Sequence, residues 1–459
     1  MSVFPVKTTL TILTFGVLIL LPDYVPALKP YKSLDVRNIP VVWDFQPHEK
    51  SKQPVEDEQV RLKPSTDERK TDIFPLIDGG AAMSHFYEAL WRADRQNGDG
   101  VVRILHYGDS PTTADLITAD TRDLLQNRFG NAGHGFVLIA KPWAWYGHRG
   151  VEISAGGWTA DAASMAAGRA DGRYGVGGVR FTGGEGAYSR LTLADRTHTA
   201  MEVAYLGQPN GGTFTVLAEG QEIGEGNTAT EASQPGYLML KLPPNTGRIE
   251  IRVKSGTVRL FGVQFLKDNP GVVYNSLGLN GAYVSVLAKF FNADHWGEQL
   301  KHYQPDLVIV NYGTNESMYA DYVDYAYRKE MREVIRRIRA AVPESSILVM
   351  SPMDRGQRDS SGEITTVPTL LRLVPMQQQI ADEGGCGYFN TFQAMGGPGT
   401  MGKWYAAEPR LVGADFIHPM PSGAKLVGNL LYRALLDGFN KYKLKHMKEQ
   451  FAKQGEIAQ

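Results

Sequence analysis

The sequence is poor in cysteine: Cys386 is the only one in 459 residues. A single cysteine excludes an intrachain disulfide, and no cysteine–histidine cluster has the spacing of a zinc site. We interpret the Cys386 thiol as structural, because no activating group stands beside it in GGCGYF. We therefore expect no zinc site and no cofactor, and we leave open a calcium ion in the β-rich middle part of the chain.

The sequence also lacks an excess of either charge. Lys and Arg number 48, Asp and Glu number 49, and the formal net charge is −1. Without a basic field, binding to nucleic acid is not expected, and a neutral or carbohydrate substrate suits this balance better. The hydrophobic content of 42% is typical of a globular protein, and the length predicts two domains with accessory segments.

An apolar run near the N-terminus is too short for an ordinary membrane span. It extends over the thirteen residues from Thr9 to Leu21 and follows Lys7, as in the core of a secretory signal. Segment 1–27 therefore predicts export to the periplasm or cell envelope, or secretion. An uncleaved membrane anchor is the alternative, because Pro26 crowds the cleavage site. The charged, proline-containing stretch 28–73 predicts a solvated linker.

The rest of the chain changes character twice. Buried strands alternate with helices in its first and last parts, which predicts an α/β domain with a parallel sheet. We expect strands at 101–107, 306–311, 346–351 and 387–392, and helices at 82–93, 113–129, 280–291, 319–342, 370–382 and 423–442. The middle part is rich in glycine and contains short alternating runs at 201–206, 213–218, 237–242 and 248–254. These predict a β-sandwich.

We therefore predict an α/β domain in two parts, 74–145 and 269–442. An inserted β-sandwich at 146–268 separates the two parts, and a C-terminal tail occupies 443–459.

Polar residues follow the predicted first strand. Gly108, Asp109 and Ser110 stand between that strand and a helix. Ligands of open parallel sheets bind at the carboxyl ends of strands, where a serine is exposed and near backbone N–H groups that can hold an oxyanion. For this tripeptide alone, a helix cap is the plainer interpretation.

Three further elements complete a possible reaction site. Asp415 and His418 are spaced so that one loop can present both, with His418 as general base and Asp415 fixing its tautomer. Asn315 follows another strand and offers a neutral amide donor, and Gly281 allows close approach of the backbone to a ligand. A surface histidine, a turn and a helix start are the plainer interpretations of the three.

The four elements in this order resemble the SGNH/GDSL hydrolase family. The resemblance places the nucleophile on Ser110 in HYGDS, and it matches Gly281, the segment GTNE with Asn315, and the segment DFIH. It implies a flavodoxin-like three-layer sandwich. It also implies a triad of Ser110, Asp415 and His418, an oxyanion hole of Ser110, Gly281 and Asn315, and motif support from Gly108, Asp109 and Gly313.

Two positions depart from the family pattern. Pro111 follows the nucleophile where leucine is usual, and Glu316 replaces the third-block aspartate. Neither departure removes a group that the mechanism needs.

Within the family, HYGDS, NYGTNE and a β-rich insertion are similar to bacterial peptidoglycan O-acetylesterases, which carry a carbohydrate-binding-module-like β-sandwich here. This implies a serine esterase that removes O-acetyl groups from an extracytoplasmic glycan, peptidoglycan or another polysaccharide. A glycan O-acetyltransferase with the same triad is one alternative. A non-enzymatic glycan-binding protein is the other. In it, aromatic residues near the insert would stack on sugars: Trp143, Trp145, Tyr146 and Trp158.

Overall fold

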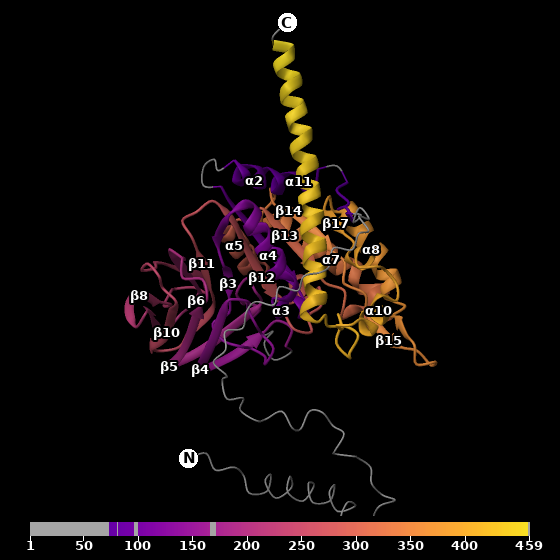
Figure 1. Cartoon of the computed structure of the whole chain (residues 1–459). Coiled ribbons are helices and arrows are strands. Elements are labelled where there is room, and N and C mark those ends of the chain that lie inside the picture. Colours follow the sequence, from indigo (N-terminus) through magenta and orange to yellow (C-terminus); the bar gives the residue numbers. More distant parts are fainter. Residues whose placement is uncertain (1–72, 80, 96–99, 166–170, 458–459) are drawn as a thin grey trace, which may run out of the picture. The chain divides into compact units, whose positions relative to one another are not determined.

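The computed structural model describes residues 73–79, 81–95, 100–165 and 171–457 (Figure 1). All of them belong to the second of two units, Thr71–Gln459. The predicted signal or anchor at 1–27 and all but the last residue of the predicted linker at 28–73 lie outside the described residues. Within the described part, no helix is both long and apolar enough to cross a membrane.

Six parallel strands form the central sheet, in the order β17-β14-β13-β1-β12-β2. They are β1 (Val101–Gly108), β2 (Asn131–Gly133), β12 (Gly271–Gly278), β13 (Leu307–Asn311), β14 (Ser346–Met350) and β17 (Gly387–Phe389). Every residue of β13 and β14 is buried, as expected for a parallel sheet covered on both faces.

Helices cover both faces of this sheet. Ile309 of β13 packs into the core beneath α2 (Ser84–Asp94), α4 (Leu116–Phe129) and α11 (Pro421–Ile457). Its neighbours Val308 and Val310 pack into the core beneath α5 (Ala293–Tyr303), α7 (Arg328–Ala341) and α8 (Leu370–Glu383). Successive side chains of a strand point to opposite faces, so this division gives three layers. The predicted three-layer α/β sandwich is confirmed.

A second, antiparallel sheet is inserted between β2 and β12. Its order is β8-β7-β10-β5-β11-β6-β9, with β3 paired to β11 and β4 paired to β5. The strands are β3 (Gly135–Val137), β4 (Val151–Ala162), β5 (Val179–Leu193), β6 (Ala200–Gly207), β7 (Thr213–Ala218), β8 (Gln221–Asn227), β9 (Gln234–Lys241), β10 (Arg248–Ser255) and β11 (Val258–Leu266). The predicted inserted antiparallel β domain is confirmed.

The inserted strands form one hydrogen-bonded sheet in place of two separate ones. The sheet curves so that strands that are not paired face each other. The ring centroids of Tyr205 in β6 and Phe214 in β7 lie 5.8 Å apart, although β6 and β7 are not neighbours in the sheet. Its first strand, β3, precedes the predicted insert boundary at residue 146.

Short elements fill the connections. They are α3 (Ser110–Thr113), α6 (Ala320–Tyr322), α9 (Thr391–Ala394), α10 (Thr400–Ala406), a π-helical turn at Val286–Phe290, a 3-10 turn at Glu316–Met318, a π-helical turn at Val323–Tyr327, and the hairpin strands β15 (Gly356–Arg358) and β16 (Ile364–Thr366).

Several predicted boundaries are wrong. The expected helix at 280–291 is only the π-helical turn at Val286–Phe290, and β12 was not predicted. The expected helix at 113–129 is interrupted at Asp115, which has left-handed backbone geometry. The last helix continues to Ile457, so the predicted tail from residue 443 is helical over most of its length.

Candidate active site

The loops that carry the predicted site residues leave the sheet side by side. Gly108, at the end of β1, pairs with Gly278 of β12 on one side and Asn311 of β13 on the other. Ser110, Gly281 and Asn315 follow these three strand ends within four residues. They therefore lie at the edge where parallel sheets bind ligands.

The nucleophile turn is held by backbone hydrogen bonds. Ser110 is the first residue of α3 and is partly exposed. The N–H groups of Thr112 and Thr113 donate to the carbonyl of Asp109 at 3.1 and 3.0 Å, while the Asp109 side chain forms no cap. A Cβ on residue 108 would lie 2.3 Å from Oγ1 of Thr112. Gly108 therefore lets the helix start directly against the strand.

Asp109 connects this turn electrostatically with the loop of the predicted base. Its side chain is buried, and burial raises the pKa of Asp109 to about 6. A hydrogen bond from Thr314 and the positive charges of His418 and Arg355 oppose this rise in pKa. His418 therefore lies close enough to the residue beside Ser110 for its charge to act there.

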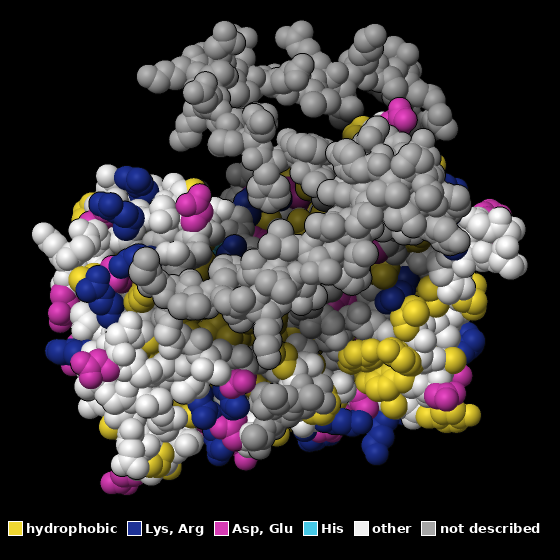
Figure 2. All heavy atoms as spheres, turned by 90° about the horizontal axis from the view of Figure 1, so that it is seen from below, with side chains coloured by type: hydrophobic (Ala, Val, Ile, Leu, Met, Phe, Trp, Pro, Cys, Tyr) yellow, Lys and Arg dark blue, Asp and Glu magenta, His cyan; other side chains and the backbone are white. Residues whose placement is uncertain are grey.

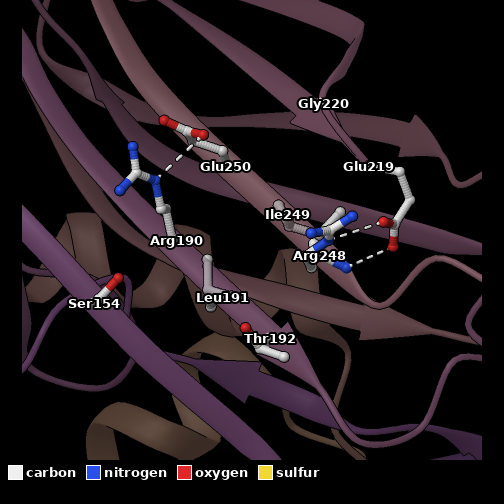
Figure 3. Close-up of a pocket in the computed structure, with 9 residues that line it drawn as sticks. All are labelled: Ser154, Arg190, Leu191, Thr192, Glu219, Gly220, Arg248, Ile249 and Glu250. Carbon is white, nitrogen blue, oxygen red and sulfur yellow. Dashed lines mark hydrogen bonds and ion pairs between the residues drawn. The ribbon is translucent and has the colours of Figure 1, made fainter.

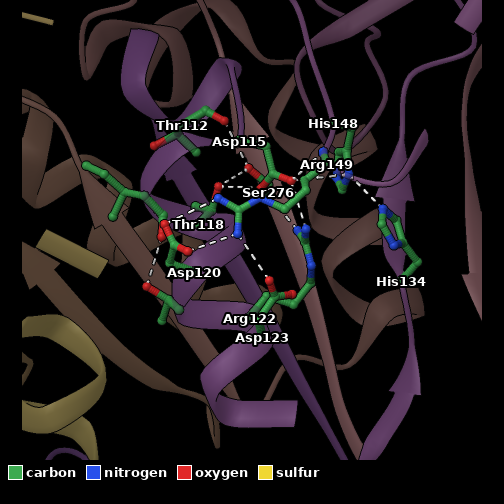
Figure 4. Close-up of polar contacts among 12 residues, drawn as sticks. Thr112, Asp115, Thr118, Asp120, Arg122, Asp123, His134, His148, Arg149 and Ser276 are labelled. Atoms are coloured by element: carbon green, nitrogen blue, oxygen red, sulfur yellow. Dashed lines mark hydrogen bonds and ion pairs between the residues drawn. The ribbon is translucent and has the colours of Figure 1, made fainter. Parts of the chain in front are cut away.

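A buried polar network lies behind the nucleophile turn (Figure 4). Arg122 donates to both carboxylate oxygens of Asp115, at 3.0 and 2.8 Å, and its charge holds the pKa of Asp115 low although burial alone would raise it. Thr118 joins Asp115 to Ser276 of β12, and the Ser276 hydroxyl donates to the carbonyl of Thr112 at 3.0 Å. The network thus ties α3 and α4 to β12.

One tight loop presents both Asp415 and His418. Nδ1 of His418 lies 2.5 Å from Oδ2 of Asp415, and the backbone N–H groups of Ile417 and His418 each donate to Oδ1 at 3.1 Å. Burial alone would raise the pKa of Asp415, but these hydrogen bonds lower it. Phe416 has φ = 58°, a strained conformation of the kind found at functional sites. Both side chains of the pair are half-exposed.

The loop after β12 is clamped to the turn after β13. Nδ2 of Asn315 donates to the carbonyl of Ala282 at 2.9 Å, and Oε1 of Glu316 accepts the N–H of Val284 at 2.7 Å. Gly281 lies on this loop with φ = 64°, where a glycine is favoured. Within the described ranges, the N–H groups of Ser110 and Gly281 donate to no protein acceptor, so both can serve a ligand.

The structure therefore brings the predicted residues together in two groups. Asp415 bonds His418, and the Asn315 turn bonds the Gly281 loop. Among the described residues, no hydrogen bond joins Ser110 to His418. Catalytic hydrogen bonds are often loose in unliganded sites and tighten with substrate. The triad and the oxyanion hole remain predictions.

Sequence reasoning missed Arg355. It follows β14, and Nη1 donates to the carbonyl of Thr314 at 2.7 Å. Burial lowers the pKa of Arg355, while the nearby acidic groups of Asp109, Tyr283 and Asp415 raise it. The rule that pointed to Ser110 and Asn315, a polar residue after a buried strand, could also have pointed to Arg355.

The pockets described below lie away from the carboxyl ends of β1, β12 and β13. The groove in Figure 3, of about 350 Å³, is lined by β4, β5, β10 and the turn between β7 and β8 of the inserted domain. The strand ends remain the candidate site nonetheless, because Ser110, Gly281 and Asn315 follow three adjacent parallel strands. In the described part of the chain, no group of three or more His, Cys, Asp or Glu residues is arranged to hold a metal ion.

The aromatic residues near the insert differ in exposure. Trp145 is 61% exposed, whereas Tyr146 is buried and Trp143 packs partly against the core. Trp158 lines a second hollow, of about 320 Å³, together with Lys141 and small residues of β4.

Comparison with known proteins identifies the fold. Residues 253–426 match the family model described as the GDSL-like Lipase/Acylhydrolase family. The chain is similar to a solved structure of a peptidoglycan O-acetylesterase, with a TM-score of 0.66, 23% identity and coverage of 80% of this chain and 99% of the other. At this identity, the similarity establishes the fold alone. No curated protein matches the sequence.

Two further solved structures match with low TM-scores. A Bacillus subtilis protein, YXIM, gives 0.32 at 15% identity, covering 62% of this chain and 90% of the other. A family two carbohydrate esterase from Clostridium thermocellum gives 0.28 at 12% identity, covering 63% and 99%. The fold and the family match agree: residues 253–426 resemble the GDSL-like family, and the chain has a parallel α/β sheet of the SGNH kind with an inserted antiparallel β domain.

Proposed function

We propose that the protein is an exported serine esterase that removes O-acetyl groups from a glycan, with peptidoglycan as the first candidate. The observation that carries this proposal is the hydrogen-bonded Asp415–His418 pair, in a chain whose Ser110 follows the end of the central strand β1. The similarity in fold to a peptidoglycan O-acetylesterase supports the choice of substrate.

In the proposed reaction, His418 takes the Ser110 proton as Oγ attacks the acetyl carbonyl. Asp415 holds the imidazole in the required tautomer and stabilises the imidazolium. The N–H groups of Ser110 and Gly281 and the Asn315 amide stabilise the oxyanion.

The C–O bond to the sugar then breaks, and His418 gives its proton to the departing sugar oxygen. Water, activated by His418, attacks the acetyl-serine. Acetate leaves and Ser110 is restored.

Acetate release from O-acetylated peptidoglycan by the full-length protein tests this proposal, with acetylated xylan for comparison and Ser110→Ala as control. We expect release that depends on Ser110, and unchanged circular dichroism in the variant. Release from xylan alone would contradict the choice of peptidoglycan. Release that persists in Ser110→Ala would contradict the serine mechanism.

The first alternative is an acetyltransferase, because the same acyl-serine can pass its acetyl group to a sugar hydroxyl. Product analysis with a donor ester, with and without a glycan acceptor, separates the two. Acetylated glycan in place of free acetate would identify a transferase.

The second alternative assigns glycan binding to the insert, and the exposure of Trp145 and the hollow beside Trp158 favour such a role. Glycan binding by the insert is also compatible with esterase activity, because it would hold the substrate near the α/β domain. Sedimentation with insoluble cell wall tests it: we expect Trp145→Ala with Trp158→Ala to bind less than the wild type, and equal binding would exclude this surface.

A further inference from the structure

Arg355 lies among loops that come from several strands. Its guanidinium contacts Thr314 in the turn after β13, through the 2.7 Å hydrogen bond from Nη1. It is also close enough to Asp109, Tyr283 and Asp415 to interact electrostatically with each of them. These residues belong to the loops after β1 and β12 and to the loop of His418, so the guanidinium lies at the edge that holds the predicted nucleophile.

In the described part of the chain, the Arg355 guanidinium forms no ion pair with a carboxylate. Among the described residues, Arg355 has no carboxylate oxygen within 4 Å of its nitrogens. Arg122 is the contrasting case, because Asp115 takes both of its terminal nitrogens in the core. Apart from the bond to Thr314, no hydrogen bond from the Arg355 guanidinium is found in the described part. A half-buried guanidinium with open donors can bind a carboxylate through two parallel hydrogen bonds.

Apolar surface borders the same place. Tyr319 is 57% exposed and Met318 is 51% exposed. Tyr283, two residues after Gly281, is half-buried, and its ring lies 6.2 Å from that of Tyr319. Figure 2 shows the molecule of Figure 1 from below, and hydrophobic and charged side chains adjoin where atoms are not drawn in grey. Exposed aromatic rings rimmed by polar groups are typical of ligand sites, and a sugar ring can pack against them.

We propose that Arg355 binds a carboxylate of the glycan while Tyr283 and Tyr319 contact its sugar ring, so that the enzyme prefers acetylated glycans with a carboxylate near the ester. This inference rests on the proposed esterase function. Peptidoglycan carries such carboxylates on its peptides, and uronic-acid polymers carry them on the sugar ring. The recognised chemistry is the same in both.

The experiment compares kcat/KM for acetate release from O-acetylated peptidoglycan, an acetylated polyuronate and a neutral acetylated cello-oligosaccharide. The full-length variants are Arg355→Gln and Arg355→Lys. Arg336→Gln is the matched control, because Arg336 pairs with Glu333 on the surface of α7. Circular dichroism and thermal unfolding confirm that each variant folds.

We expect Arg355→Gln to lower the ratio of kcat/KM for an anionic glycan to that for the neutral one by about 10- to 100-fold, mainly through KM. Arg355→Lys keeps the positive charge but lacks the planar guanidinium that binds a carboxylate through two hydrogen bonds. Its kcat/KM ratio should therefore lie between those of the wild type and Arg355→Gln. If Arg355→Gln lowers the kcat/KM ratio for peptidoglycan alone, the ligand of Arg355 is a peptidoglycan carboxylate. If it lowers the ratio for the polyuronate alone, the ligand is a uronic acid.

An unchanged ratio, or a ratio lowered equally by Arg336→Gln, would overturn the inference. Ser110→Ala separates this result from a failure of the proposed function. If it abolishes release from every substrate while the Arg355 ratio is unchanged, the esterase stands and the carboxylate site does not. If it leaves release intact, the proposed function itself fails.

Discussion

Glu316 offers a direct perturbation of the predicted oxyanion hole. Its Oε1 accepts the Val284 N–H at 2.7 Å, and its Oε2 is buried without a hydrogen-bond partner in the described part of the chain. Burial raises the pKa of Glu316 to about 8, so the carboxyl is mainly protonated at neutral pH. Glutamine has the same shape and keeps an acceptor oxygen for Val284. We therefore expect Glu316→Gln to stay active.

Glu316→Ala should behave differently, because it removes the acceptor and leaves a cavity. An unpaired buried N–H costs about 1–3 kcal/mol of stability, and the loop that carries Gly281 loses an anchor. Removing an oxyanion donor typically costs about 100- to 1,000-fold in turnover, and we expect a loss of kcat that approaches this range.

Steady-state hydrolysis of 4-nitrophenyl acetate measures the effect, with thermal unfolding to quantify stability separately. Two results would refute the reasoning. One is a wild-type kcat in Glu316→Ala. The other is a Glu316→Gln variant as inactive as Glu316→Ala, which would mean that the negative charge matters and the hydrogen bond does not.

Three further predictions follow from the geometry. Asp415→Asn should lower kcat on the order of 1,000- to 10,000-fold by favouring the wrong tautomer of His418, and a normal kcat in a steady-state assay would contradict this role. In urea titrations, Gly108→Ala should lower the free energy of unfolding by about 1–3 kcal/mol through overpacking. Gly184→Ala should be nearly neutral, because its Cβ would meet no atom nearer than 3.9 Å. The raised pKa of Glu316 means that its contribution to stability is full below its ordinary value of 4.5 and is lost as pH rises through about 8. Thermal unfolding temperatures of the wild type should therefore fall relative to Glu316→Gln between pH 4.5 and about 8, and parallel pH profiles over that range would contradict the shift.

Strands with a simple pattern could be predicted from the sequence. The run 213–218 coincides with β7, and the alternating run 248–254 falls within β10. The continuous apolar runs of β13 and β14 were also recognisable. In each case, the spacing of apolar residues within the strand itself indicates which side chains are buried.

The strand β12 was missed because a polar residue, Asn275, occupies one of its buried positions. The Asn275 side chain donates to the carbonyl of Ile104 and accepts the N–H of Phe136 and a bond from Gln264. These partners are distant in sequence. Nothing in GVVYNSLG itself therefore shows that its polar groups are satisfied in the core.

The prediction of a helix at 280–291 is wrong because the contacts that shape the candidate active site hold the start of this segment in a loop. Gly281 has a positive φ, and the N–H of Val284 is taken by Glu316. A helix cannot start regularly where the loop is held in this way.

The candidate site was predictable where residue chemistry and strand ends coincide. Ser110, Asn315 and the Asp415–His418 pair carry groups whose use is evident from their type and spacing. The roles of Arg355 and Glu316 arise from neighbours brought together by folding, namely Thr314 and Val284. No local pattern encodes those contacts.

The central claim is that Ser110 becomes acetylated during turnover. Rapid acid quenching of the full-length protein with O-acetylated peptidoglycan, followed by peptide mass spectrometry, measures this directly. We expect one acetyl group on the peptide that contains Ser110, and none in Ser110→Ala. Acetate release without acetyl on Ser110, or acetyl on another residue that depends on turnover, would contradict the account.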